Sequence, residues 1–174
     1  MRKIKLPFGA DSNSPELFAA IMDASFFGVV TSTKNPTQAI IELLRARQIN
    51  SIHLEPNTLD ESLLKAADIT FTHAPDPGIK VGVTKAVCGL ADTGSVLIVD
   101  GEGSPLQASL LPEIHIAILQ TSKILPSLEN AMPLVRDSKA AVFISGPSRT
   151  ADIEMTLTIG VHGPGELHVL LVDG

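Results

Sequence analysis

A helix that leads directly into a strand is encoded by residues 35–54, NPTQAIIELLRARQINSIHL. Asn35 has a side chain that caps helices, and Pro36 suits the first helical position. An apolar stripe at helical spacing follows, made of Ala39, Ile40, Leu43 and Leu44. The short run Ser51–Leu54 predicts a buried strand, although periodicity alone does not separate such a run from a helix. This helix–strand unit is the building block of a layered α/β fold.

The same alternation of strand-type and helix-type segments continues on both sides of this unit. We expect further strands at Phe26–Thr31, Ile69–Thr72, Ser95–Val99, Ile114–Leu119 and Lys139–Ser145. We expect helix starts at Thr58, where Thr58-Leu59-Asp60-Glu61 fits a capping box, at Thr84, whose helix would end at Leu90, and at Thr121 or Ser122. The alternation predicts an α/β fold with a largely parallel sheet.

The C-terminal part of the chain contains two strand-type runs that are close together in sequence. Only the four residues His162-Gly163-Pro164-Gly165 separate the run Thr156–Val161 from the run Glu166–Val172. A connection that short joins antiparallel strands, because parallel strands need a crossover of a dozen or more residues. We therefore expect an antiparallel hairpin near the C-terminus and a sheet that is mixed at that edge.

The composition is that of one globular domain, residues 1–174. Hydrophobic residues make up 44% of the chain and charged residues 18%, and no apolar run reaches the ~20 residues that span a bilayer. Arg2, Lys3 and Lys5 are followed by Pro7 and Asp11, where a signal peptide needs an apolar stretch. We therefore expect a cytoplasmic protein.

The single cysteine and the acidic charge argue against several kinds of site. Cys88 alone forms no intramolecular disulfide and cannot ligate an iron–sulfur cluster, so any cluster would belong to a partner. The net charge is -6 and the chain has no Trp or Tyr, so it lacks the basic stripe and the stacking side chains that nucleic-acid binding uses. His53, His73 and His115 are scattered without metal-ligand spacing, and we expect no metal site.

The segment from Ser145 to Asp152 is the first candidate for a ligand site. It leaves a predicted strand and enters what we interpret as a helical turn, the position where open α/β sheets bind ligands. Free backbone N–H groups and donor side chains there suit a carboxylate or phosphate. The expected ligand-binding residues are Ser145, Gly146, Ser148, Arg149 and Thr150. The competing interpretation is structural: Ser148 caps a helix, Arg149 points to solvent and Asp152 complements the helix dipole.

His162 and a set of carboxylates are the candidates for catalysis. His162 lies at the tip of the expected hairpin beside Gly163, where an imidazole could reach a neighbouring cleft and titrate near neutrality. Asp152 and Glu154 would share one face only if that segment were extended. Asp92 stands at an expected helix end and could face the same sheet edge, although a plain turn explains it equally well. We expect His162 to converge with the Ser148–Asp152 segment on one cleft, which would form a single site for an anion.

Several blocks in the last 95 or so residues resemble a known family. They are Val81-Gly82-Val83-Thr84, Ala91-Asp92-Thr93-Gly94-Ser95, Ser109-Leu110-Leu111-Pro112 with Ile114-His115-Ile116-Ala117, Ile144-Ser145-Gly146-Pro147-Ser148 with Thr150-Ala151-Asp152-Ile153-Glu154, and Gly160-Val161-His162-Gly163-Pro164 with Leu167-His168-Val169. In this order they resemble the lactate-utilisation protein C family, also called the LUD domain. Asp92 stands where members commonly carry Glu, and Gln107 where a basic residue is common.

The resemblance implies a fold and a role. The fold is that of phosphosugar isomerases and CoA transferases, a three-layer α/β/α arrangement with a mostly parallel sheet. The role is in bacterial L-lactate oxidation to pyruvate, beside partner subunits that carry the iron–sulfur clusters. This division of labour agrees with a chain that has one cysteine and is expected to need no cofactor of its own.

Three functional hypotheses follow. The leading one is a cluster-free component of L-lactate utilisation that binds a small carboxylate or other anion. The second is a stand-alone enzyme acting on a CoA-linked or phosphorylated small acid, with Asp92, Asp152 or Glu154 as nucleophile or base. The third is a structural subunit without a ligand. Whether the chain is an enzyme is therefore open from the sequence.

Overall fold

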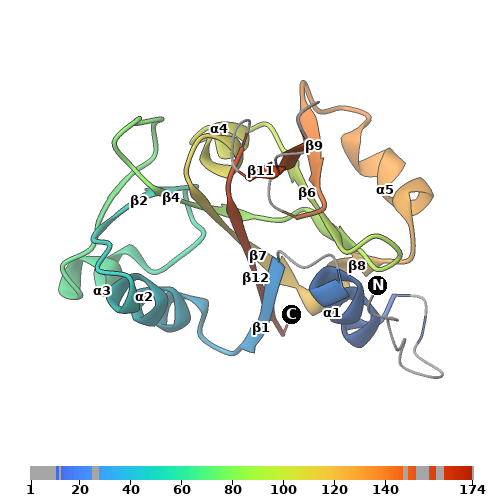
Figure 1. Cartoon of the computed structure of the whole chain (residues 1–174), viewed down its shortest axis with the longest axis horizontal. Coiled ribbons are helices and arrows are strands. Elements are labelled where there is room, and N and C mark those ends of the chain that lie inside the picture. The colour runs from blue at the N-terminus through green and yellow to red at the C-terminus, as the bar shows by residue number, and fades with distance from the viewer. Residues whose placement is uncertain are drawn as a thin grey trace.

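A six-stranded, all-parallel sheet forms the centre of the molecule in the computed structural model (Figure 1). The structure describes residues 11, 13–24, 28–146, 149–151, 157–159 and 163–173. The strand order is β1-β12-β7-β4-β2-β3. The strands are β1 (Gly28–Thr33), β12 (Glu166–Val172), β7 (Ile114–Gln120), β4 (Val81–Lys85), β2 (Ser51–Leu54) and β3 (Thr70–Thr72). The predicted α/β architecture with a mostly parallel sheet is confirmed.

Helices cover both faces of this sheet and produce two separate apolar cores. Helices α2 (Pro36–Ala46) and α3 (Glu61–Ala66) lie on one face, where Ile40, Leu44 and Leu64 pack against Val83 and Ile116. Helices α1 (Pro15–Ala24) and α4 (Pro105–Leu110) lie on the opposite face. Because side chains alternate along a strand, the central strands β7 and β12 contribute to both cores.

Helix α4 approaches strand β4 closely enough to require a glycine. A Cβ built on Gly82 would stand 1.7 Å from the backbone oxygen of Ala108 and 2.7 Å from its carbonyl carbon. Real side chains do not approach backbone atoms that closely, so α4 can pack here only against the bare strand. Gly82 therefore sets the distance between α4 and the sheet.

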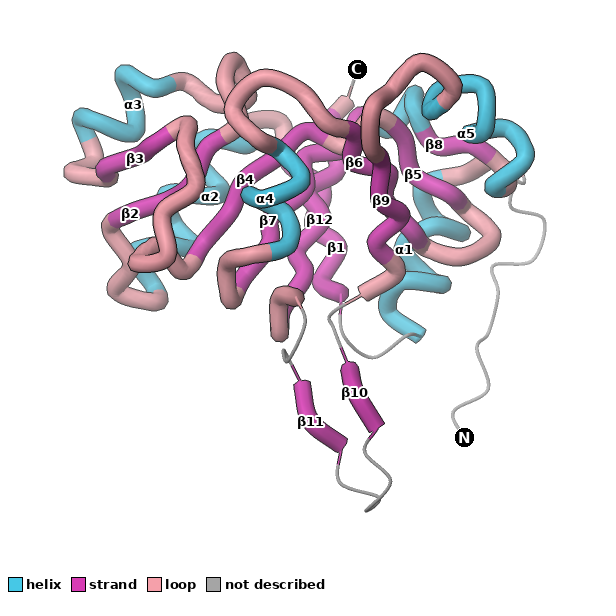
Figure 2. The backbone as a smooth tube through the Cα atoms, turned by 90° about the horizontal axis from the view of Figure 1, so that it is seen from above, coloured by secondary structure: helices cyan, strands magenta, loops and turns pink. Residues whose placement is uncertain are grey.

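A second, four-stranded sheet lies beside the parallel one (Figure 2). Its order is β8-β5-β6-β9, with β8 (Ile124–Leu125), β5 (Cys88–Leu90), β6 (Ser95–Val99) and β9 (Ala141–Ile144). A short 3-10 helix, η1 (Thr121–Lys123), leads from β7 into β8. Helix α5 (Leu128–Val135) packs on this sheet through Ala131, which joins Cys88, Leu90 and Leu97 in a third apolar cluster.

The antiparallel hairpin near the C-terminus exists, but its strands differ from the predicted ones. Strand β10 (Arg149–Ala151) pairs with β11 (Leu157–Ile159), and both project away from the body of the molecule (Figure 2). Strand β12 instead lies inside the parallel sheet between β1 and β7, with Glu166 opposite Ile114. The parallel sheet is therefore not mixed at that edge.

Local signals predicted some elements well and others wrongly. Asn35 caps α2, accepting a hydrogen bond from the backbone N–H of Gln38 at 3.1 Å. The N-cap of α3 is Asp60, not Thr58. The helix expected from Thr84 to Leu90 is wrong, because those residues end β4 and form β5. At Thr121 the chain forms only the single turn η1.

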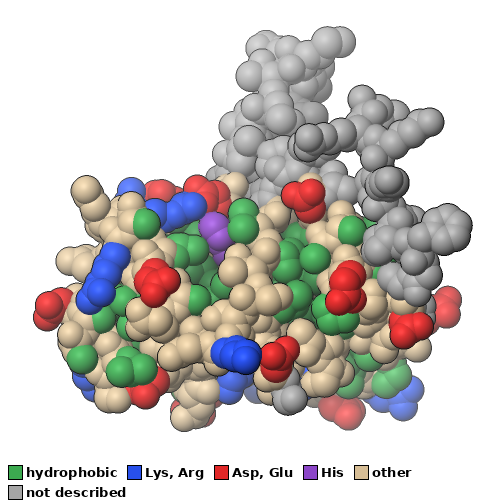
Figure 3. Space-filling view, turned by 90° about the horizontal axis from the view of Figure 1, so that it is seen from below, with side chains coloured by type: hydrophobic (Ala, Val, Ile, Leu, Met, Phe, Trp, Pro, Cys, Tyr) green, Lys and Arg blue, Asp and Glu red, His purple; other side chains and the backbone are tan. Residues whose placement is uncertain are grey.

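None of the helices in the described part of the chain is long and apolar enough to cross a membrane. Basic and acidic side chains are interspersed on the face shown in Figure 3, and the described part of that face gathers no single stripe of positive charge.

Candidate functional site

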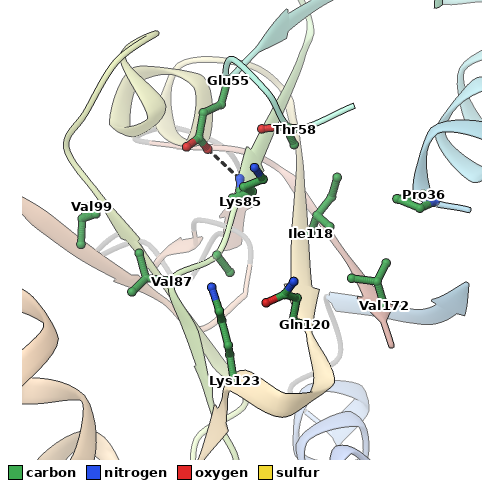
Figure 4. Close-up of a pocket in the computed structure, with 11 residues that line it drawn as sticks. Pro36, Glu55, Thr58, Lys85, Val87, Val99, Ile118, Gln120, Lys123 and Val172 are labelled. Atoms are coloured by element: carbon green, nitrogen blue, oxygen red, sulfur yellow. Dashed lines mark hydrogen bonds between the residues drawn. The ribbon is translucent and has the colours of Figure 1, made fainter. Parts of the chain in front are cut away.

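A pocket of about 470 Å³ opens at the carboxyl ends of the parallel strands (Figure 4). We call it the carboxyl-edge pocket. Its residues come from the ends of β4, β7 and β12, from the segment after β2 and from the nearest parts of β6, η1 and α2. The lining residues are Pro36, Glu55, Thr58, Lys85, Ala86, Val87, Val99, Ile118, Gln120, Lys123 and Val172.

The topology of the sheet explains why a pocket forms at this edge. After β2 the chain turns to α3, on the face that α2 also covers. After the neighbouring strand β4 the chain passes to β5 and the second sheet, on the opposite face. Adjacent strands whose continuations separate in this way leave a crevice outside their carboxyl ends, and open α/β sheets bind ligands there.

Lys123 provides a cationic group in this pocket that forms no ion pair within the described part of the chain. It ends η1, and its side chain extends into the pocket with its ammonium near Val87 and Gln120 (Figure 4). Within the described residues, no carboxylate forms an ion pair with it and no hydrogen bond engages it. The ammonium and the Gln120 amide are therefore donors available to an anion.

Lys85 and Glu55 join the ends of β4 and β2 at the other side of the pocket. The backbone N–H of Lys85 donates to Glu55 Oε2 at 2.6 Å, and Lys85 Nζ donates to the carbonyl oxygen of Asn57, also at 2.6 Å. Burial raises the pKa of the Glu55 carboxyl, and the bond from Lys85 and its charge only partly oppose that rise. Lys85 thus has a partner already, whereas Lys123 does not.

The helix dipole of α2 adds positive potential at one end of the pocket. Pro36, the first residue of α2, lines that end together with Val172. The N-terminus of an 11-residue helix carries a partial positive charge that favours anions. The pocket therefore combines two lysines, a helix N-terminus and one carboxylate of raised pKa.

The predicted site residues around Ser145 lie elsewhere. The hydroxyls of Thr93, Ser95 and Ser145 form what we call the hydroxyl chain, with oxygen–oxygen distances of 2.7 Å from Thr93 to Ser95 and 2.6 Å from Ser95 to Ser145. Ser95 begins β6 and Val99 ends it at the pocket, so four steps of roughly 3.3 Å put the chain about 13 Å away from the pocket. The structure thus brings together two of the quoted sequence blocks, but outside the carboxyl-edge pocket.

The conformations near the hydroxyl chain explain some of its sequence pattern. Gly94 has a φ of 64° in the turn between β5 and β6, and Gly146 has a φ of 123° directly after Ser145. Both values favour glycine. Asp92 is exposed in the same turn, where the plain-turn interpretation places it. Gly163 has a φ of 148° shortly before β12 begins.

Only some of the remaining predicted site residues belong to the part of the chain that the structure describes. Ser148, Asp152, Glu154 and His162 lie outside the described residues, so their convergence on one cleft stays a prediction. Arg149 and Thr150 belong to strand β10, so the helical turn expected there is wrong. The support that a helix N-terminus would have given to anion binding at this segment is therefore lost, and the role of its side chains also stays a prediction.

Sequence reasoning missed the residues of the carboxyl-edge pocket, although a signal was present. Glu55 directly follows the predicted strand Ser51–Leu54, and Gln120 directly follows the predicted strand Ile114–Leu119. Polar residues just after parallel strands gather at one sheet edge. This signal was missed for Lys85 because Lys85 fell inside the helix predicted from Thr84 to Leu90.

Burial shifts the pKa values of two histidines and of the single cysteine. Burial lowers the pKa of His115 to about 3, and its Nε2 lies 2.9 Å from the Thr84 hydroxyl oxygen. His168 is buried beside Arg47 and Glu166, and burial lowers its pKa. Burial raises the pKa of Cys88 to about 11, an inert thiol. No group of three or more potential metal ligands occurs among the described residues.

The sequence and the fold of this chain are similar to those of known proteins. The LUD domain family matches residues 77–172, more than half of the chain. The chain belongs to the LUD domain family. That match covers the strands that line most of the carboxyl-edge pocket, from β4 to β12.

Relatives of this LUD domain include proteins named for lactate utilisation. The chain is 40% identical to Lactate utilization protein C 1 of Bacillus mycoides, over 63% of the chain and 48% of that protein. It is 37% identical to Lactate utilization protein C of Bacillus subtilis, over 53% of the chain and 42% of that protein. The chain thus spans about half the length of these relatives or less.

Two further matches cover nearly the whole LUD domain chain. An uncharacterized protein of Neisseria meningitidis is 39% identical over 98% of the chain and 82% of that protein. The crystal structure of a DUF162 family protein from Deinococcus radiodurans superposes with a TM-score of 0.62 at 18% identity, covering 90% of this chain and 94% of that one. At that identity the likeness concerns the fold alone.

Proposed function

We propose that this LUD domain is a component of bacterial L-lactate utilisation and binds a small carboxylate or other anion in the carboxyl-edge pocket. The role is suggested by the names of its relatives, which are 34 to 40% identical over the matched part. The observation that carries the binding proposal is the ammonium of Lys123, which reaches into the pocket and is paired with no carboxylate among the residues that the structure describes.

A carboxylate in this position would accept charge-assisted hydrogen bonds. Lys123 would donate to one oxygen and the Gln120 amide to the same or the other oxygen. Hydrogen bonds to charged groups contribute about 1.5–3 kcal/mol each. Glu55 stands on the other side of the pocket, where its carboxylate already accepts a hydrogen bond from the backbone N–H of Lys85.

The electron-transfer chemistry of L-lactate oxidation to pyruvate would reside in partner subunits. The chain contains one cysteine, which is buried and has a raised pKa, so it offers no set of thiolates for an iron–sulfur cluster. We therefore propose iron–sulfur lactate-utilisation proteins as the partners. Affinity purification at native expression from cells grown on L-lactate tests this, and purification without such partners would contradict it.

The binding proposal is tested by calorimetric titration of the purified chain with L-lactate, pyruvate and inorganic phosphate. Lys123→Gln should weaken binding of the best of these anions about tenfold or more, because it removes the cationic donor. Lys139→Gln is the matched control, since Lys139 is also exposed but does not line the pocket. Equal affinities for Lys123→Gln and the unmodified chain would refute the proposal.

Glu55 favours a second candidate function, the stand-alone enzyme acting on a CoA-linked or phosphorylated small acid. It is a half-buried carboxylate of raised pKa that lines a pocket, as a general acid or base requires. Incubation of the isolated chain with acyl-CoA and sugar-phosphate panels tests this candidate. Turnover that needs no partner and is lost in Glu55→Gln would support it over the leading proposal.

A further inference from the structure

The carboxyl-edge pocket is larger than a three-carbon acid needs. Lactate has six non-hydrogen atoms, and even at the ~30 Å³ that each water molecule occupies in the liquid they would fill no more than about 180 Å³. The pocket volume is about 470 Å³. A lactate ion held by Lys123 would therefore leave more than half of the pocket to solvent.

Apolar side chains form a substantial part of the pocket lining. Six of the eleven lining residues are apolar, namely Pro36, Ala86, Val87, Val99, Ile118 and Val172. In Figure 4 they extend to both sides of Lys123 and Gln120, with Val87 and Val99 on one side and Pro36 and Val172 on the other. Val87 and Val99 are only partly covered by their own apolar cluster. Apolar side chains that line a concave site favour a ligand with an apolar body.

We infer that the pocket takes a carboxylic acid with an apolar chain longer than that of lactate. This inference rests on the proposed anion binding at Lys123 and specifies the class of acid. The carboxylate lies at Lys123 and Gln120, and the chain lies along Ala86, Val87 and Val99. Each methylene removed from water there raises the affinity about fourfold, because burial of one CH₂ contributes ~0.8 kcal/mol.

The test is a titration of the whole chain with straight-chain 2-hydroxy acids of three, six and eight carbons. We expect 2-hydroxyhexanoate to bind roughly fifty-fold more tightly than L-lactate, since it adds three methylenes. Alkylammonium ions of the same chain lengths are the control for unspecific partition. They should bind weakly, because Lys123 repels them. Equal affinity of acids and alkylammonium ions would overturn the inference.

A pair of matched variants assigns the effect to the pocket. Val87→Phe fills part of the apolar space and should remove most of the rise in affinity with chain length, measured as the ratio of 2-hydroxyhexanoate to L-lactate affinity within the same variant. Val29→Phe places the same substitution on the exposed strand β1, outside the pocket, and should change nothing. If affinity still rises as steeply with chain length in Val87→Phe, the inference is overturned.

The outcomes separate this inference from the proposed function. If all chain lengths bind equally and Lys123→Gln abolishes binding, the anion site stands and the larger ligand class is wrong. If no acid of any length binds, the proposed anion function is wrong and the inference fails with it. If affinity rises with chain length and falls in both Lys123→Gln and Val87→Phe, both are supported.

Discussion

The carboxyl-edge pocket and the hydroxyl chain lie at opposite ends of the same strand, β6, and they differ in how their polar groups are used. In the hydroxyl chain, the hydroxyls of Thr93, Ser95 and Ser145 satisfy one another. In the pocket, Lys123 reaches into a cavity and has no partner among the described residues. Polar residues that satisfy one another stabilise a fold, whereas an ammonium that lines a cavity without such a bond keeps its donors for solvent or a ligand.

The comparison also shows why the motif-rich region was the more conspicuous one in the sequence. The turn around Ser95 and the turn around Ser145 each consist of consecutive residues and each include a glycine with positive φ, so each turn forms a recognisable block. The pocket residues come from several separate strand ends and form no block. A conspicuous motif therefore marked a constrained turn, while the cavity depended on long-range assembly.

The largest expected effect concerns the packing behind the pocket, which the hydroxyl chain does not share. Gly82→Ala should destabilise the fold by about 3 kcal/mol, because its Cβ would collide with the backbone of Ala108 and displace α4 from β4. Urea unfolding monitored by circular dichroism measures this. Gly101→Ala is the control, since its Cβ would meet only Pro105 Cγ at 3.9 Å, and should stay within about 0.5 kcal/mol. Equal stability of the two variants would show that α4 can shift freely.

A pH-dependent effect on stability should arise at His115 in strand β7, whose other end lines the pocket, and not in the hydroxyl chain. The pKa of His115 is about 3 in the folded chain and near 6.5 when unfolded, so only the unfolded state gains a proton as the pH falls below 6.5. His115 therefore costs stability at acidic pH, on the order of 2 kcal/mol between pH 6.5 and 4.5.

Substitution of His115 tests this directly. Unfolding free energies of His115→Gln, measured across that pH range, should fall less steeply than those of the unmodified chain. The unfolding free energy of Ser145→Ala should change with pH in the same way as that of the unmodified chain, because the hydroxyl chain contains no group that titrates in this pH range. Parallel curves for all three proteins would contradict the pKa assigned to His115.

A crossed pair of substitutions should separate binding from stability. Lys123→Gln should cost about 2 kcal/mol of anion affinity and leave thermal stability unchanged, because the exposed ammonium has no partner to lose. Ser95→Ala should cost about 1 kcal/mol of stability and leave affinity unchanged, because it removes a buried link of the hydroxyl chain. Both variants go through the same calorimetric and thermal assays. If Ser95→Ala weakened anion binding as much as Lys123→Gln, the two regions would be coupled.

The smallest expected effect concerns Glu55. Because burial raises its pKa above the ordinary value, its contribution to stability is fully present below the unfolded pKa and is lost as the pH rises through the folded pKa. Glu55→Gln should therefore be slightly more stable than the unmodified chain at pH 7, by no more than about 0.5 kcal/mol, and should lose that advantage near pH 4. Thermal melts at both pH values provide the measurement. A variant that is less stable at pH 7 would show that the bond to Lys85 needs the carboxylate.

Local chemistry predicted the elements whose signals lie within a few residues of one another. Ser51–Leu54 and Ser95–Val99 are strands with the predicted bounds, and Asn35 caps the helix that it was expected to cap. Propensity failed at Thr84–Leu90, because pairing with β7, β6 and β8 outweighs a weak capping signal.

The amino-acid sequence alone determined the α/β class, the LUD family resemblance, and the lack of a thiolate set for a cluster. These follow from composition and from short-range patterns. Only the tertiary structure decided that β12 pairs with β1 and β7, more than forty residues away in the chain, rather than with its sequence neighbour. It alone also decided that Glu55, Lys85 and Lys123 share one cavity. The physical reason is that strand pairing across long separations depends on which apolar faces can be buried together, and no local pattern encodes that choice.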